Sequence, residues 1–311
     1  MKHVYSLWFK NALSAPDRSL MEDIIQEEAQ LLRITSLSDS ERLHFLEDWV
    51  IRSINQASVV QKTLDEEKHL ELLRWISTTP FSRYHESLSQ ARMPNSATWL
   101  LQHPEYRAWN NSSSSSILLL HGIPGSGKSN ICSAVVDSHL AASQQAGATA
   151  APMAYYYCAS CDFEPERSQP DDVMRSILRQ LTVSTTTNQR KVRDILMSEF
   201  DRKQAQSRLK GFDMDKPTIE DCIRLILEVA ITDPISIVVD GLDMIEEVHR
   251  PKLINALVNI VQKSSSVVKI FLSSRYNGHV ISLLEDARSG SRPLSTQQVA
   301  STPVTLIEIN R

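Results

Sequence analysis

Residues 117–129 read ILLLHGIPGSGKS, and this stretch decides the fold. From Gly122 to Ser129 it fits the pattern G-x-x-x-x-G-K-[ST] at every fixed position. The apolar run before the motif predicts a buried strand, and the run from about Asn130 onward predicts a helix, which is the context that this motif requires. We therefore predict a P-loop, in which glycines let backbone N–H groups turn toward phosphate oxygens at the start of a helix.

The residue types in this loop predict individual contacts with a nucleotide and its metal ion. Lys128 is expected to reach the β- and γ-phosphates, and the Ser129 hydroxyl to bind Mg²⁺. A glycine-bearing turn that matches the motif by chance is the alternative, but the chain has only 8 glycines and three of them fall in this loop. The predicted nucleotide contacts are Gly122, Pro124, Gly125, Ser126, Gly127, Lys128, Ser129 and Asn130.

A second apolar run, ISIVV at 235–239, ends in Asp240. A carboxylate at the end of a neighbouring strand is expected to hold the Mg²⁺ ion, here through a water molecule. Asp243 follows three residues later and could orient an attacking water. Capping of the next helix is the alternative role for both aspartates.

A third run, VVKIFL at 267–272, is followed by Ser273, Ser274 and Arg275. A polar group at the end of a buried strand can sense a γ-phosphate, and Arg275 is the candidate for this role. An ion pair at the surface is the alternative, because most arginines lie there.

Apolar runs separated by helical segments predict the fold class, an α/β P-loop NTPase with a parallel sheet between two helical layers. We place this domain at residues 91–311, with core strands over about 117–309, after a helical N-terminal region at 1–90. Apolar residues spaced by three or four predict a long helix from Glu41 toward Pro80, and an earlier helix over 20–32. The predicted strands are ILLL at 117–120, AYYYC at 154–158, ISIVV at 235–239, VVKIFL at 267–272 and VTLIEI at 304–309.

Composition excludes several functional classes. The chain has 33 basic and 37 acidic residues, a net charge of −4, so no overall positive field would attract nucleic acid or an anionic membrane. No apolar run is long enough to span a membrane, and the N-terminus lacks a secretory signal, so we expect a cytoplasmic protein. The 4 cysteines are expected to be reduced, and the Cys158–Cys161 pair lacks the second pair that structural zinc needs.

The segments HGIPGSGKS, ISIVVDGLD and KIFLSSRY resemble the NACHT branch of the STAND NTPases. The resemblance is closest to the fungal NLR-like proteins with a nephrocystin-3-like NACHT module, and it covers roughly residues 68–311. Residues 96–109, with Trp-Leu-Leu and a later Trp109, resemble the segment that precedes the P-loop in this family.

The resemblance implies a signalling switch of the innate-immunity or heterokaryon-incompatibility type. ADP would hold a closed monomer, and exchange for ATP with Mg²⁺ would open it for self-association. Apart from the resemblance, we expect the N-terminal helices to bind a protein partner, with packing inside a helical domain as the alternative for their apolar face. The sequence departs from the family in two ways. Met244 stands where the family commonly has Glu, so hydrolysis is expected to be slow or lost. The winged-helix and repeat regions that the family has after the core are not expected within the residues up to Arg311. A nucleotide-dependent interaction module without hydrolysis, or a small-molecule P-loop kinase, are the alternatives.

Overall fold

The computed structural model describes residue 26 and residues 39–146, 151–160, 164–183, 187–211, 213–231, 233–289 and 303–309. Within these ranges the chain divides into two compact units, Met1–Lys68 and His69–Arg311. The division falls inside one long helix, α3, which runs from Asp39 to Ile76 and confirms the helix predicted there. The helix predicted over 20–32 lies outside the described residues, apart from residue 26.

The second unit is built on a five-stranded sheet with the order β2-β3-β4-β1-β5, in which every neighbouring pair is parallel. All five predicted strands are confirmed. Because the strands are parallel, their carboxyl ends meet at one edge of the sheet, which gathers the residues that follow β1, β3 and β4. The strands are β1 (Ser116–Gly122), β2 (Met153–Tyr157), β3 (Ile235–Asp240), β4 (Val268–Arg275) and β5 (Val304–Ile309).

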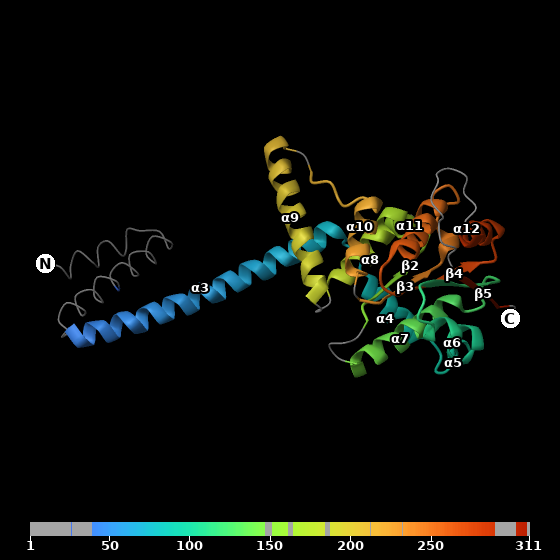
Figure 1. Ribbon diagram of the computed structural model, residues 1–311, viewed down its shortest axis with the longest axis horizontal. Coiled ribbons are helices and arrows are strands. Elements are labelled where there is room, and N and C mark those ends of the chain that lie inside the picture. Colours follow the sequence, from blue (N-terminus) through green and yellow to red (C-terminus); the bar gives the residue numbers. More distant parts are fainter. Residues whose placement is uncertain are drawn as a thin grey trace, which may run out of the picture. The chain divides into compact units, whose positions relative to one another are not determined.

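Both faces of the sheet are covered, which explains why its strands are continuously apolar. In β1, Ile117 and Leu119 point into one hydrophobic cluster, whereas Leu118 and Leu120 point into the other. Helices α8, α10 and α11 lie on the first face, and α5, α6 and α7 on the second (Figure 1). The predicted three-layer α/β arrangement is therefore confirmed.

The helices on the first face are α8 (Pro170–Val183), α9 (Thr187–Lys210), α10 (Ile219–Val229), α11 (Arg250–Lys263) and α12 (Gly278–Ser289). Those on the second face are α4 (Phe81–Ala91), α5 (Thr98–Gln102), α6 (Pro104–Asn111) and α7 (Lys128–Ala146). The last turns of α3 also belong to the second unit, where Leu72 and Ile76 are buried. This unit thus includes the end of α3 and the whole of α4, and so begins before residue 91.

A partly buried polar cluster fixes α4 to α7. The Asp137 carboxylate of α7 accepts hydrogen bonds from Arg92 Nη2 at 2.6 Å and Ser89 Oγ at 2.9 Å, and it lies 3.0 Å from His85 Nε2. Although burial raises the pKa of Asp137, the hydrogen bonds from Arg92 and Ser89 outweigh it and lower that pKa. The other ring nitrogen of His85 lies 2.8 Å from the Tyr157 hydroxyl at the end of β2. The segment before the P-loop is therefore held by charge as well as by packing.

Candidate nucleotide-binding site

The predicted P-loop connects the end of β1 to the first turn of α7. Gly125 and Gly127 have φ angles of 79° and 81°, in the left-handed region that favours glycine, and a Cβ atom at either would meet nothing within 4 Å. Glycine is therefore needed at these two positions for its backbone conformation and not for lack of space. Gly122 differs, because a Cβ atom there would lie 2.4 Å from the carbonyl oxygen of Ile309 in β5. The first glycine of the motif thus lets β1 and β5 pair at their ends.

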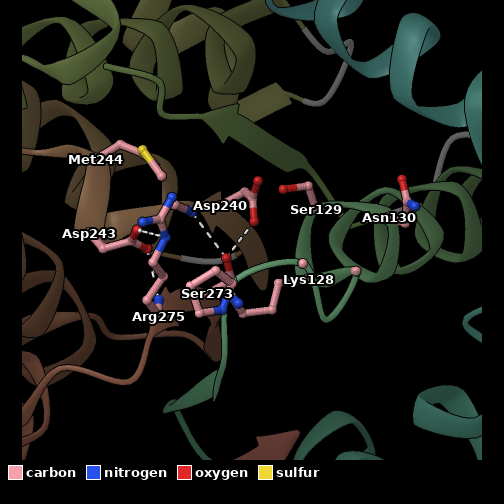
Figure 2. Close-up of a pocket in the computed structure, with 12 residues that line it drawn as sticks. Lys128, Ser129, Asn130, Asp240, Asp243, Met244, Ser273 and Arg275 are labelled. Carbon is pink, nitrogen blue, oxygen red and sulfur yellow. Dashed lines mark hydrogen bonds and ion pairs between the residues drawn. The ribbon is translucent and has the colours of Figure 1, made fainter. Parts of the chain in front are cut away.

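A hollow of about 280 Å³ opens at the carboxyl edge of the sheet, between the P-loop and the ends of β3 and β4 (Figure 2). We call it the phosphate hollow. Most of the predicted site residues line it, and they come from three separate segments of the sequence, 124–130, 240–244 and 273–275. The lining residues are Pro124, Gly125, Gly127, Lys128, Ser129, Asn130, Asp240, Gly241, Asp243, Met244, Ser273 and Arg275.

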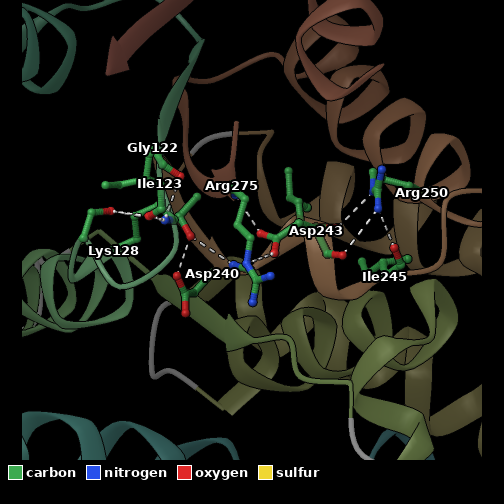
Figure 3. A network of polar contacts seen from close by, with 12 residues as sticks. Gly122, Ile123, Lys128, Asp240, Asp243, Ile245, Arg250 and Arg275 are labelled. Carbon is green, nitrogen blue, oxygen red and sulfur yellow. Dashed lines mark hydrogen bonds and ion pairs between the residues drawn. The ribbon is translucent and has the colours of Figure 1, made fainter. Parts of the chain in front are cut away.

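Lys128 is folded back on its own loop. Its Nζ donates to the carbonyl oxygens of Gly122 at 3.0 Å and Ile123 at 2.8 Å, and to Ser126 Oγ at 3.2 Å (Figure 3). Burial lowers the pKa of Lys128, while the nearby carboxylates of Asp243 and Asp240 act in the opposite direction. The ammonium group is therefore held by weak neutral acceptors that phosphate oxygens could replace with stronger, charged ones.

Asp240 is buried at the end of β3, with 4% of its surface exposed. Its Oδ1 accepts hydrogen bonds from Cys132 Sγ at 3.2 Å and from Ser273 Oγ. Ser273 Oγ in turn accepts from the Gly241 backbone N–H at 3.0 Å, so the carboxylate is fixed by α7 and β4 together. Figure 2 shows the Ser129 hydroxyl and the Asp240 carboxylate directed toward one another.

This pair of oxygen donors fits a magnesium ion. Mg²⁺ in nucleotide sites is held by one or two protein oxygens, by phosphates and by water, and not by a cage of protein ligands. Among the described residues, no group of three or more His, Cys, Asp or Glu could hold a metal by itself. Ser129 and Asp240 would therefore hold Mg²⁺ only together with the phosphates, whose negative charge the ion would neutralise.

Asp243 and Arg275 form an ion pair at the rim of the same hollow. Arg275 Nε lies 3.1 Å from Asp243 Oδ2, and the backbone N–H of Arg275 donates to Asp243 Oδ1 at 2.8 Å (Figure 3). Asp243 is 10% exposed and Arg275 52%. The short helix η3 (Leu242–Met244) has Gly241 as its N-cap and no side-chain cap, so Asp243 does not cap it.

Comparison with known proteins identifies the domain around these residues. The family model described as nephrocystin 3, N-terminal matches residues 95–275, more than half of the chain. The chain belongs to this family. The match begins at the turn before α5 and ends at Arg275, so it contains the whole phosphate hollow of this nephrocystin 3 N-terminal domain. No curated protein matches the sequence significantly.

Solved structures similar to this nephrocystin 3 N-terminal family member include the Walker-type ATPase PABY2304 of Pyrococcus abyssi. It has 12% identity and a TM-score of 0.38, and the match covers 75% of this chain and 57% of that one. The Aeropyrum pernix ORC1 protein, solved in complex with DNA, has 15% identity and a TM-score of 0.37, with 69% and 45% covered. The chain therefore spans about half the length of these proteins. Among the described helices of the family member, none is both long and apolar enough to cross a membrane.

Residues without an expected role also shape the site. Cys132 lies one helical turn after Ser129 and reaches Asp240, a position that the helical spacing could have indicated. The buried Arg250 of α11 donates to the carbonyl oxygens of Leu242 at 3.1 Å and Ile245 at 2.8 Å, and so fixes η3 (Figure 3). No local sequence signal marks Arg250 for this role.

A second hollow of about 230 Å³ lies at the P-loop beside helix α5. We call it the tryptophan hollow. It contains Ser126, the one predicted nucleotide contact besides Gly122 that does not line the phosphate hollow. Its lining residues are Ser96, Trp99, Gly125, Ser126, Gly127, Asn130 and Ile131.

Proposed function

We propose that this chain is an ATP- and ADP-binding signalling switch of the STAND type, which self-associates when ATP replaces ADP. The observation that carries the proposal is the Asp243–Arg275 ion pair at the rim of the phosphate hollow, which Lys128 and Ser129 also line. A switch needs contacts that differ between its two ligands, because a ligand shifts an equilibrium only by its difference in affinity for the two states.

The ion pair supplies such a difference. With ADP bound, Arg275 keeps Asp243 as its partner, since no terminal phosphate competes for the guanidinium group. ATP adds an anion that attracts Arg275 and repels the Asp243 carboxylate. Asp243 lies in η3, which Arg250 fixes to α11. A movement of η3 on loss of the ion pair would therefore be transmitted to α11. Lys128 would exchange its carbonyl acceptors for phosphate oxygens in both states.

Hydrolysis is slow or absent under this proposal. Asp243 is the candidate for orienting an attacking water, but both of its oxygens are engaged by Arg275: Oδ1 accepts a hydrogen bond from the backbone N–H, and Oδ2 forms an ion pair with Nε. The next residue, Met244, presents a thioether to the phosphate hollow and cannot accept a proton. The same residue favours the alternative function, a nucleotide-dependent interaction module that never cleaves the γ-phosphate.

The remaining parts of the proposal concern organisation and partners. We assign nucleotide binding to residues 91–311 and the recruitment of a protein partner to the helical region at 1–90. In support, α3 presents large apolar side chains, among them Trp49 and Ile54, which are 56% and 62% exposed. We further propose a cytoplasmic location, no nucleic acid partner, and a role as a fungal NLR-like protein with a NACHT module, on the basis of charge and motif resemblance.

The test combines nucleotide binding with particle size. The purified chain and its Lys128→Ala variant are titrated with Mg·ATP and Mg·ADP, while released phosphate and light scattering are recorded. The proposal expects binding of both nucleotides, little phosphate, growth in size with ATP only, and loss of binding in the variant. A chain that binds ATP without any change in size leaves only the interaction module, and a chain that binds neither nucleotide refutes both.

A further inference from the structure

The tryptophan hollow adjoins the phosphate hollow along the P-loop. Gly125, Gly127 and Asn130 line both of them. A nucleoside triphosphate is an extended molecule. If its terminal phosphates lie near Lys128 and Asp240, its nucleoside must lie outside the phosphate hollow, further along the P-loop. The tryptophan hollow shares these three residues with the phosphate hollow and therefore offers this path.

One of the side chains that line this hollow is a large aromatic residue that is partly exposed. In the segment around α5, Ala97 and Leu100 are buried at 3% and 0% exposure, and they anchor it in the core. Trp99, between them, is 40% exposed and lines the hollow instead. A large aromatic side chain left partly in water beside a P-loop has apolar surface available for a ligand.

The local structure holds Trp99 in this position. Asn95 has a φ of 61°, a left-handed conformation that asparagine tolerates, and it makes the turn into α5. The Thr98 hydroxyl donates to the carbonyl oxygen of Asn95 and closes this turn. The rings of Trp99 and His103 meet edge to face with their centroids 6.2 Å apart. The indole is thus supported from the protein side before any ligand arrives.

We propose that the tryptophan hollow binds the nucleoside part of the nucleotide, with a purine base stacked on the Trp99 indole and the hydroxyl or amide groups of Ser96 and Asn130 near the sugar. The proposal rests on the proposed nucleotide-binding function and adds the residue that recognises the base. An aromatic platform suits a purine better than a pyrimidine, because the larger ring system buries more surface on the indole.

The test compares ATP with inorganic tripolyphosphate, which carries the phosphates without the nucleoside. Binding of both, with Mg²⁺, is measured by calorimetry for the full chain and for the Trp99→Ala and Trp99→Phe variants. Stacking of a base on an aromatic side chain predicts that Trp99→Ala weakens ATP binding by between about fivefold and a hundredfold. Trp99→Phe should restore most of this loss, and tripolyphosphate should bind all three proteins equally.

The control is Leu209→Ala, which removes another exposed large apolar side chain, on α9, and should leave ATP binding unchanged. Thermal unfolding of each variant shows whether the fold is retained. The inference is overturned if Trp99→Ala binds ATP like the wild type, or if it loses ATP and tripolyphosphate to the same extent. If the wild type binds no ATP, the proposed function itself fails, and the two failures are thereby distinguished.

Discussion

Replacing Asp240 with asparagine should weaken the binding of Mg·ATP and leave the fold intact. Asparagine keeps an oxygen that can accept the hydrogen bonds of Cys132 and Ser273, so the contacts of the buried side chain survive. We expect the free energy of unfolding to change by less than about 1 kcal/mol, since no buried group loses its partner. What disappears is the negative charge that faces Ser129.

The size of the binding defect follows from that charge. A carboxylate about 4 Å from a divalent ion, through water, attracts it by roughly 8 kcal/mol at an effective dielectric constant of about 20, which is a ceiling because phosphates and water also neutralise the ion. Losses of 10- to 100-fold in metal affinity are typical when a residue in the second coordination shell is replaced, or about 1.4 to 2.7 kcal/mol. We expect Asp240→Asn to fall in that interval.

The assay measures ATP affinity by calorimetry with Mg²⁺ and with a chelator. The wild type should bind more tightly with the metal, and Asp240→Asn should lose most of this gain while its metal-free affinity stays the same or rises. Asp65→Asn, an exposed carboxylate on α3, serves as the matched control and should behave like the wild type. If Asp240→Asn keeps the full magnesium dependence, Asp240 does not hold the metal and the reasoning is wrong.

Three further predictions concern stability, each measured by urea unfolding. Gly122→Ala should cost about 1 to 3 kcal/mol, because its Cβ would lie 2.4 Å from the Ile309 carbonyl oxygen; an unchanged midpoint would contradict the close approach of β1 and β5. Burial raises the pKa of Cys222 from 9.0 to about 12, so above pH 9 the thiol ionises in the unfolded chain but not in the folded one. This thiol should therefore lower the free energy of unfolding by about 2 kcal/mol at pH 10.5, and Cys222→Ala should remove this contribution to the pH dependence. Asp137, whose pKa is lowered, should contribute stability that is present above pH 4 and lost at lower pH. Asp137→Asn should lower the free energy of unfolding by about 1 to 3 kcal/mol at pH 7, because it weakens the bond to Arg92, and should reduce the loss of stability below pH 4. An unchanged loss of stability in acid would exclude this role.

The parts of the fold that the sequence predicted are those set by local patterns. A strand such as 117–120 is apolar on both faces because helices cover both faces, so a continuous run of four apolar residues was sufficient to identify it. The P-loop was equally local, since the positive φ angles of Gly125 and Gly127 belong to the motif itself.

Contacts between distant segments could not be predicted in the same way. Asp243 and Arg275 are 32 residues apart, and only the adjacency of β3 and β4 in the sheet brings them together as an ion pair. The sequence supported separate roles for them and offered an ion pair as the alternative for Arg275. In the structure Arg275 pairs with Asp243 and also lines the phosphate hollow, and its role as a sensor of the γ-phosphate stays a prediction. Gly122 is similar, because its close contact with Ile309 depends on a strand near the end of the chain.

The thiol of Cys132 offers a way to observe the site in motion. It is fully buried against Asp240, and burial raises its pKa well above the ordinary value, so the reactive thiolate hardly forms while the site is closed. Alkylation of this one side chain, followed by mass spectrometry, therefore requires that α7 separate from the end of β3. The rate of modification in the presence of each nucleotide would measure the free energy of that local opening, using a chemical probe that the protein already contains.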